Sequence, residues 1–370
     1  MRLLVLGGTL FLGRAVVEAA LAAGDRVTIF TRGRTNPDLY PDAERLRGDR
    51  ETDLSPLARR TWDAVVDTSG YVPRVVRAAA EALAGRVAHY TFVSSISVYR
   101  DFREGPREDS PVEILDDPAS EDVQEHYGAL KALCEDVVRD VYGERALVAR
   151  AGLIVGPHDP TGRFTYWVTR VAEGGDVLAP GSPDRRVQLV DVRDLGEWIV
   201  RMAKSRRGGT FNATGPVPPV TMGELLDTCG RVSSSDARLV WVDDAFLLER
   251  GVEQWQELPL WIASPEFGGM IAADVTRAVA AGLTFRPVED TVRATLAWAT
   301  STDVGEPSRK QGVELPEAGL RPAREAELLR AWREQAGGGT PRERGRGNPA
   351  PAVPGLNLGA RQGAGQGNLA

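Results

Sequence analysis

Two side chains at helical spacing have the types that proton transfer needs. Tyr127 and Lys131 are four positions apart in the segment YGALK, so on a helix they lie on one face, one turn apart. The chain has 370 residues, with seven tyrosines and three lysines, so a Tyr followed by a Lys at this spacing is expected only about 0.06 times by chance. A phenol ionises at about pH 10, and a nearby ammonium stabilises its phenolate. The pair could therefore act as an acid or a base.

A glycine-rich turn near the N-terminus is typical of a phosphate-binding unit. The apolar run Arg2–Leu6 predicts a buried strand, and apolar periodicity predicts a helix over Phe11–Ala23. Gly7 suits the tight turn, and Gly13 allows the helix to pack closely on the strand. The helix N-terminus would offer free N–H groups to a pyrophosphate. Leu10 stands at the middle glycine position, so an ordinary glycine-rich turn is the alternative.

Strands and helices alternate after this unit. The sequence predicts a strand over Asp25–Thr31 and a further strand whose last residues are Leu46–Asp49. It also predicts strands over Ala64–Val66 and Ala88–Val93, and a helix over Val76–Leu83. A helix that connects two strands makes a right-handed crossover and leaves the strands parallel. The fold class is therefore predicted to be α/β, with a doubly wound, Rossmann-like parallel sheet.

Residues that follow parallel strands face the ligand crevice of such a sheet. We therefore expect Asp49 to accept a hydrogen bond from an adenine amino group, and Thr68 and Ser69 to line the cofactor. Plain roles as turn residues are the alternative.

The end of the second strand indicates which dinucleotide is bound. Sites specific for NAD carry a carboxylate there that binds the ribose 2′-hydroxyl. This chain has Arg32 and Arg34 instead, and a guanidinium suits a 2′-phosphate. The prediction is NADP(H) in preference to NAD(H), with a solvated arginine as the alternative.

The composition argues against several classes of partner. A net charge of −7 and a pI near 5.3 disfavour a nucleic-acid or membrane surface. No apolar run reaches the ~18 residues of a membrane-spanning helix. Two cysteines, 95 positions apart, fit a reduced cytoplasmic protein, and the three histidines lack the spacing of metal ligands. We expect a small-molecule substrate, no nucleic acid, no membrane and no metal.

The motifs together resemble a known family. GGTLFLG, FVSSISVY and YGALK, in this order, resemble the extended short-chain dehydrogenase/reductases, the NAD-dependent epimerase/dehydratase group. Similar segments continue to about residue 300. The resemblance implies that Ser95, Tyr127 and Lys131 are catalytic, and that a homodimer is compatible with the fold. Together with the glycine turn and the strand ends, this predicts thirteen residues at the cofactor: Gly7, Thr9, Leu10, Phe11, Leu12, Gly13, Arg32, Asp49, Thr68, Ser69, Ser94, Tyr127 and Lys131.

Several positions depart from the family pattern. Leu10 replaces a glycine, Ala151 and Val155 replace the usual proline and tyrosine, and Arg100 follows Tyr99 where glycine is common. The form GGTLFLG is similar to an atypical branch that includes plant chloroplast stem-loop-binding proteins.

The resemblance implies an NAD(P)-dependent oxidoreductase acting on a carbonyl or secondary alcohol, with Tyr127 as acid or base. One alternative is a nucleotide-sugar epimerase or dehydratase with tightly bound NAD. Another is a non-catalytic nucleotide- or RNA-binding protein of the same fold.

The predicted domains interleave. Residues 1–160 would form the dinucleotide-binding domain, joined again by segments near 187–215, and residues 161–300 the smaller substrate lobe. In that lobe Trp167 is a candidate pocket wall, with a core position as the alternative. Arg163 and Arg193 could bind an anionic substrate group. A C-terminal helix is predicted within 315–336 and a disordered tail over 337–370.

Overall fold

The centre of the molecule is a parallel sheet of seven strands, in the order β11-β6-β5-β4-β1-β2-β3. The computed structural model describes residues 1–117, 119–301 and 318–337. The strands of the sheet are β1 (Arg2–Leu6), β2 (Arg26–Thr31), β3 (Glu44–Arg47), β4 (Trp62–Asp67), β5 (Val87–Ser95), β6 (Ala146–Ala151) and β11 (Gly209–Ala213). This doubly wound parallel sheet confirms the predicted fold class.

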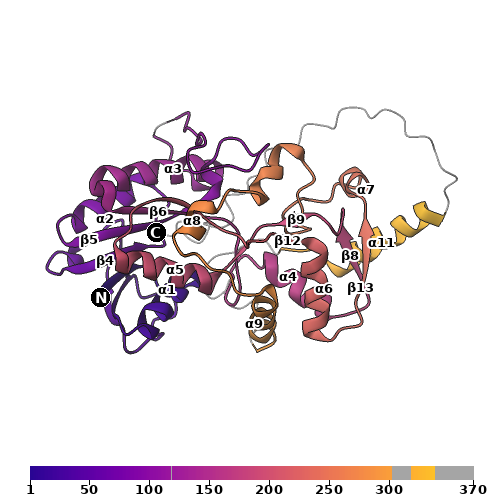
Figure 1. The fold of residues 1–370 in the computed structure, drawn as a ribbon, viewed down its shortest axis with the longest axis horizontal. Helices are drawn as coiled ribbons and strands as arrows, with labels where there is room; N and C mark the ends of the chain where they lie inside the picture. The colour runs from indigo at the N-terminus through magenta and orange to yellow at the C-terminus, as the bar shows by residue number, and fades with distance from the viewer. Residues whose placement is uncertain (118, 302–317, 338–370) are drawn as a thin grey trace.

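Helices cover both faces of the sheet (Figure 1). On one face α1 (Phe11–Ala22) packs against α5 (Val192–Ser205), and on the other α2 (Pro73–Leu83) packs against α3 (Val123–Tyr142). Successive residues of β1 therefore enter different cores: Leu3 and Val5 face α1 and α5, whereas Leu4 and Leu6 face α2 and α3. A strand buried on both sides is apolar at nearly every position, which is why Arg2–Leu6 could be predicted.

The third strand ends two residues before the predicted end at Asp49. β3 stops at Arg47, and the Gly48 N–H donates to the Thr31 carbonyl. Asp49 then forms an isolated bridge with Asp53 inside a turn. Residue 48 must be a glycine for this close approach, because a Cβ there would lie 2.6 Å from the Phe30 ring.

A second lobe contains three short strand pairs and a group of helices. β7 (Ile154–Val155) pairs with β10 (Val190–Asp191), β9 (Arg186–Val187) with β12 (Val220–Thr221), and β8 (Asp176–Pro180) with β13 (Arg238–Val242). The helices of this lobe are α4 (Arg163–Ala172), α6 (Met222–Ser233), α7 (Asp244–Glu249) and α9 (Val288–Ser301), whereas α8 (Thr276–Ala280) packs against β11 of the central sheet. A core that includes Trp167 and Trp261 lies among α4, α6 and α9.

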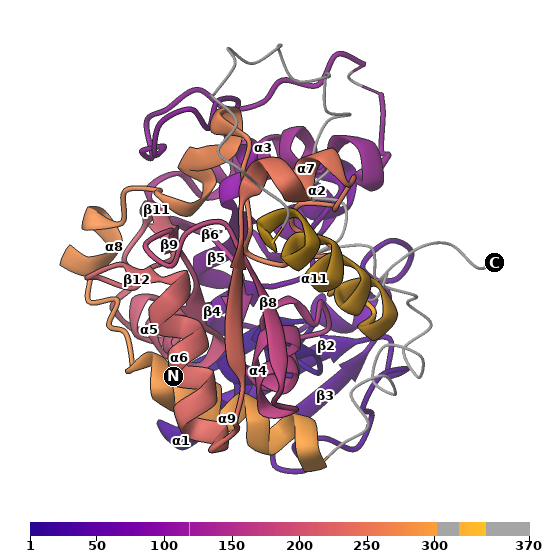
Figure 2. The ribbon, with the colours of Figure 1, turned by 90° about the vertical axis from the view of Figure 1, so that its right-hand side faces the viewer.

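The helix predicted within 315–336 is α11 (Pro322–Gly337), which lies alongside β8 (Figure 2). The predicted disordered tail falls almost entirely outside the described residues. Short 3₁₀ helices span Ser55–Leu57, Ile96–Val98, Gly143–Arg145 and Pro265–Ile271. Among the described helices, none combines the length and apolar character needed to cross a bilayer.

Candidate active site

A cavity of about 290 Å³ opens at the carboxyl edge of the sheet. Loops that follow β1, β2, β3, β4 and β5 line it, together with one face of α3. All thirteen residues predicted to contact a cofactor are among the lining residues, from Gly7 to Lys131. The structure thus brings these residues together, as expected for the carboxyl ends of parallel strands.

The turn between β1 and α1 needs its glycines at two positions. Gly7 has φ +108°, and a Cβ there would lie 2.6 Å from Thr68 Oγ1. A Cβ on Gly13 would lie 2.6 Å from the Gly8 nitrogen. Leu10, by contrast, has φ −127°, an extended conformation that any residue adopts, and its side chain is exposed. The missing middle glycine therefore leaves the turn intact, and no side chain caps the first N–H groups of α1.

The end of the cavity near β2 carries positive charge. Arg32 and Arg34 both line it and are exposed. Within the described ranges, neither guanidinium has an ion-pair partner, so both could meet an anionic ligand. Asp49 lies beside them in the cavity wall.

Arg50, which the sequence reasoning did not select, lies in the same wall. Its Nη1 and Nη2 each donate to a carboxylate oxygen of Asp67 at 2.8 Å, and Nη1 also donates to Ser69 Oγ at 2.9 Å. The Tyr90 hydroxyl donates to Asp67 as well. Burial alone would raise the pKa of Asp67, but the Arg50 guanidinium and these donors hold that pKa below its usual value. The pair fixes the loop after β3 to the loop after β4.

Lys131 and Tyr127 extend from α3 toward the end of β5. The Lys131 ammonium is buried and donates to the carbonyl oxygens of Gly70 at 2.9 Å and Val93 at 2.5 Å. Burial lowers the pKa of Lys131 to about 8. Burial raises the pKa of Tyr127, and the neighbouring Tyr71 raises it further, whereas a hydrogen bond with Ser95 lowers it. A phenol of raised pKa holds its proton until a base or a developing negative charge takes it.

The two serines at the end of β5 have different surroundings. Ser95 contacts Tyr127, and its Oγ donates to Ser97 Oγ at 3.0 Å. Ser94 lines the cavity, but its Oγ donates to the buried Glu135 at 2.6 Å. Ser95 is therefore the serine that contacts Tyr127, although Ser94 and not Ser95 is among the residues that line the cavity.

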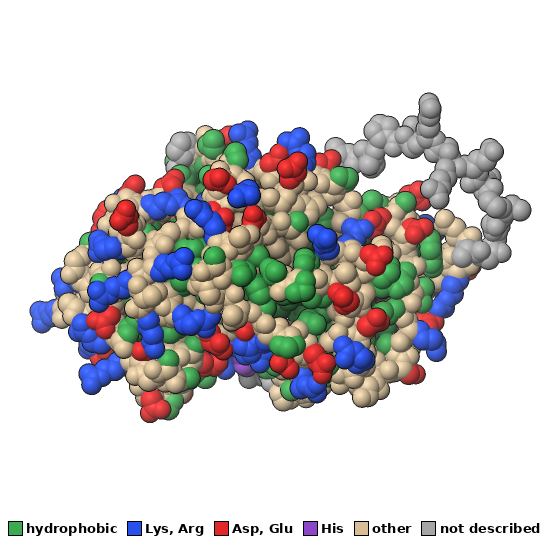
Figure 3. Space-filling model, in the orientation of Figure 1, with side chains coloured by type: hydrophobic (Ala, Val, Ile, Leu, Met, Phe, Trp, Pro, Cys, Tyr) green, Lys and Arg blue, Asp and Glu red, His purple; other side chains and the backbone are tan. Residues whose placement is uncertain are grey.

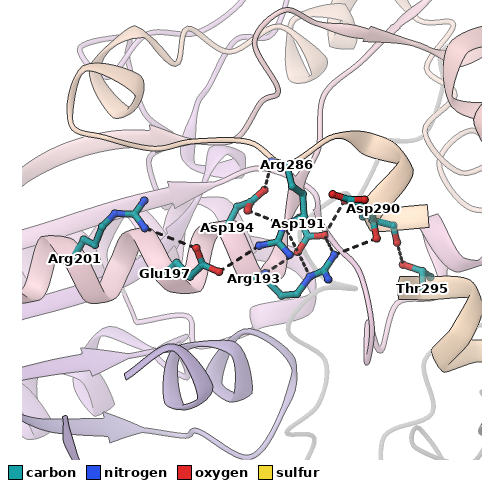
Figure 4. Close-up of polar contacts among 9 residues, drawn as sticks. Asp191, Arg193, Asp194, Glu197, Arg201, Arg286, Asp290 and Thr295 are labelled. Carbon is teal, nitrogen blue, oxygen red and sulfur yellow. Dashed lines mark hydrogen bonds and ion pairs between the residues drawn. The ribbon is translucent and has the colours of Figure 1, made fainter. Parts of the chain in front are cut away.

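The three residues predicted for the substrate lie outside the lining of this cavity. Trp167 is fully buried, and its Nε1 donates to the Pro259 carbonyl at 2.8 Å. Arg163 is buried 5.7 Å from the Trp255 ring. Arg193 pairs with Asp191 at 2.6 Å in the network of Figure 4. Trp167 is therefore a core residue and not a pocket wall, and Arg193 forms an internal ion pair and not a substrate contact. Periodicity and charge in the sequence could not distinguish a pocket residue from a core or paired residue.

The comparisons with known proteins agree with this geometry. The model described as "NAD dependent epimerase/dehydratase family" matches residues 58–214. The central part of the chain is thus similar to that family. The match includes Thr68, Ser69, Ser95, Tyr127 and Lys131, and it confirms the resemblance seen in the sequence.

A curated protein similar to this chain is the chloroplast stem-loop binding protein of 41 kDa b from Arabidopsis thaliana, which is 25% identical over 255 residues. The match covers 62% of this chain and 62% of the length of that relative.

Solved structures share the fold at low sequence identity. UDP-glucuronic acid 4-epimerase from Bacillus cereus, in complex with NAD, has a TM-score of 0.59 and 16% identity and covers 81% of this chain and 99% of its own. A putative epimerase from Burkholderia cenocepacia has a TM-score of 0.61 and 19% identity, covering 81% and 98%. These structures share the Rossmann-like fold of this chain.

Proposed function

We propose that the chain is an NADP(H)-preferring oxidoreductase that transfers hydride to or from a carbonyl or secondary alcohol. The observation that carries this proposal is a single cavity lined by the glycine turn, by Arg32 and Arg34, and by Tyr127 and Lys131. The match of residues 58–214 to an NAD-dependent family supports it.

The lining residues fit a dinucleotide. The backbone at Gly7 and Gly13 leaves no room for side chains, so a pyrophosphate could approach the uncapped start of α1. Arg32 would bind a 2′-phosphate, and Asp49 the adenine amino group. When bound, the cofactor supplies or accepts the hydride.

Tyr127 would handle the proton of the reaction. In reduction its hydroxyl donates a proton to the carbonyl oxygen while hydride reaches the carbonyl carbon, so the carbonyl becomes an alcohol. In oxidation the phenolate takes the proton of the alcohol. The Lys131 ammonium stabilises that phenolate, and Ser95 would hold the same substrate oxygen in position.

The Tyr127→Phe variant tests this role. It should lose turnover by at least a hundredfold and keep NADPH binding within a fewfold, because only the proton donor is removed. NADPH consumption with a panel of ketones, enones and sugar nucleotides measures the first effect, and cofactor fluorescence the second. Tyr142→Phe is the matched control on the same helix, since the Tyr142 hydroxyl donates to the Ala80 carbonyl and lines no part of the cavity. Turnover that survives Tyr127→Phe would rule out the acid/base role.

A nucleotide-sugar epimerase or dehydratase is the second candidate. The similarity to UDP-sugar 4-epimerases solved with NAD supports this reading. Such an enzyme would reduce and reoxidise a tightly held NAD in each cycle. Native mass spectrometry of the purified protein distinguishes the two: retained stoichiometric NAD favours the epimerase, and an empty site favours a reductase that exchanges its cofactor.

A binding role in place of catalysis rests on the stem-loop binding relative. The face shown in Figure 3 carries acidic and basic side chains interspersed, without the continuous basic surface that phosphate contacts need. A salt titration of RNA binding tests this role: tight binding that weakens steeply with salt supports it, and no binding at low salt dismisses it.

A further inference from the structure

The Lys131 ammonium lies between two aromatic rings as well as two carbonyl oxygens. Its Nζ is 4.2 Å from the centroid of the Phe92 ring and 5.4 Å from that of Tyr71. Both distances fall within the range of cation–π attraction, about 6 Å. Gly70 O and Val93 O occupy two of its three N–H donors. The ammonium is thus held on several sides, with one donor left.

Tyr71 is the member of this group that the mechanism above does not use. It follows β4, lines the cavity, and has its ring centroid 6.4 Å from that of Tyr127. These contacts are made by the Tyr71 ring, which lies near both Lys131 and Tyr127. Tyr71 therefore touches the two groups that would move and stabilise the proton.

The loop that carries Tyr71 is fixed on its other side. The Ser69 N–H donates to Asp67 at 3.1 Å, and Arg50 binds Asp67 and Ser69. A Cβ on Gly70 would lie 2.7 Å from both the Phe92 ring and Val76, so the backbone approaches the sheet closely only because residue 70 is glycine. This close approach puts the Gly70 carbonyl and the Tyr71 ring at Lys131 together.

We propose that Tyr71 is a positioning residue, whose ring forms with Phe92 an aromatic cage that keeps the Lys131 ammonium charged and aimed at Tyr127 and the cofactor. The catalytic consequence of this cage rests on the proposed function. The cage itself does not, because it can be measured on the protein without substrate or cofactor.

The surroundings of Lys131 explain why such a cage has an effect. Cys134 and Glu135 face it from α3, while Asp67 and Arg50 face it from the ends of β4 and β3. Burial disfavours the charged amine, and its pKa of about 8 lies close to neutral pH. An aromatic face attracts the ammonium and not the neutral amine, so removing a ring should lower the pKa further.

The chain is well suited to a direct test, because it has only three lysines, Lys131, Lys204 and Lys310. Full-length protein labelled with ¹³C-lysine gives three side-chain signals, and Lys131→Met identifies the one that belongs to the cage. We expect the Tyr71→Leu variant to shift the Lys131 titration by about one pH unit toward acid. Tyr71→Phe, which keeps the ring, should titrate as the wild type does.

Two results would overturn the cage. One is an unchanged Lys131 titration in Tyr71→Leu, and the other is an equal shift in Tyr71→Leu and Tyr71→Phe, which would assign the effect to the hydroxyl. Tyr71→Met is the second ring-free variant if Tyr71→Leu does not fold, as judged by circular dichroism. Once a substrate is found, the alkaline limb of the pH–rate profile should move to lower pH in the ring-free variant alone. A shifted titration with no turnover on any substrate would contradict the proposed function and leave the cage standing.

Discussion

At the scale of single residues, the proposed preference for NADP(H) depends on Arg32 and Arg34. Both are exposed in the cavity wall, and within the described ranges neither is held by a carboxylate. A guanidinium forms charge-assisted hydrogen bonds to a phosphate that a ribose hydroxyl cannot match. If the proposal is correct, phosphorylation of the ribose is the feature that these side chains detect.

We predict that Arg32→Ala weakens NADPH binding by about ten- to a hundredfold, since a charge-assisted hydrogen bond contributes about 1.5 to 3 kcal/mol. NADH binding should stay within a fewfold of the wild type. Fluorescence titrations with both cofactors measure this difference. Arg26→Ala is the matched control, because Arg26 is an exposed arginine at the opposite end of the same strand. Equal weakening of both cofactors would refute the NADP assignment.

At the scale of elements, one carboxylate holds α11 on the second lobe. Glu325 is buried; its Oε2 accepts from Arg170 Nε at 2.6 Å, and its Oε1 accepts from the Leu178 N–H of β8 at 2.9 Å. Leu328 and Leu329 of α11 are buried in the core of the lobe. The helix is therefore attached by a buried ion pair as well as by apolar contacts.

Removing this carboxylate should destabilise the protein markedly. We expect Glu325→Ala to lower the free energy of unfolding by about 2 to 4 kcal/mol, because Arg170 and the Leu178 N–H lose their partner in a buried setting. Urea denaturation followed by tryptophan fluorescence measures the change. Glu327→Ala, in which an exposed pair with Arg324 is lost, should cost about 1 kcal/mol or less. Similar losses in both variants would contradict the role of Glu325.

At the scale of the whole molecule, a charge network joins α5 to the segment that leads into α9 (Figure 4). Arg286 binds Asp194 at 2.7 Å through its Nε, and Thr291 donates to Asp191 at 2.8 Å. Arg193 bridges Asp191 and the Asp290 carbonyl. Since α5 packs on the sheet and α9 in the second lobe, these contacts bind the two parts together.

The Arg286→Ala variant should therefore be less stable, and the loss should depend on pH. Burial raises the pKa of Asp194 even beside Arg286, and without the guanidinium that pKa should rise further. A carboxylate left unpaired is unfavourable only when ionised, so the difference from wild type should be largest near pH 7 and shrink toward pH 4. Thermal unfolding at several pH values measures this, with Arg293→Ala as the exposed control. A loss that is equal at all pH values would point to packing and not to charge.

Local sequence patterns determined the parts of this protein that depend on neighbours along the chain. The strand Arg2–Leu6, the turn at Gly7 and the helical spacing of Tyr127 and Lys131 follow from apolar periodicity and glycine positions, which a short segment specifies by itself. The positions of the predicted strand ends indicated which residues line the cavity, because the carboxyl ends of parallel strands meet at one edge of a sheet.

Only the tertiary structure decided which distant side chains meet. Arg50 finds Asp67 from 17 positions away, and Tyr71 meets Lys131 from another element, although no spacing in the sequence marks either pair. Trp167 lies in the core, and Arg193 is bound by Asp191, yet by composition both could have lined a pocket. The reason is physical: burial and pairing depend on what the rest of the fold places around a side chain, and a sequence segment contains only half of each such contact.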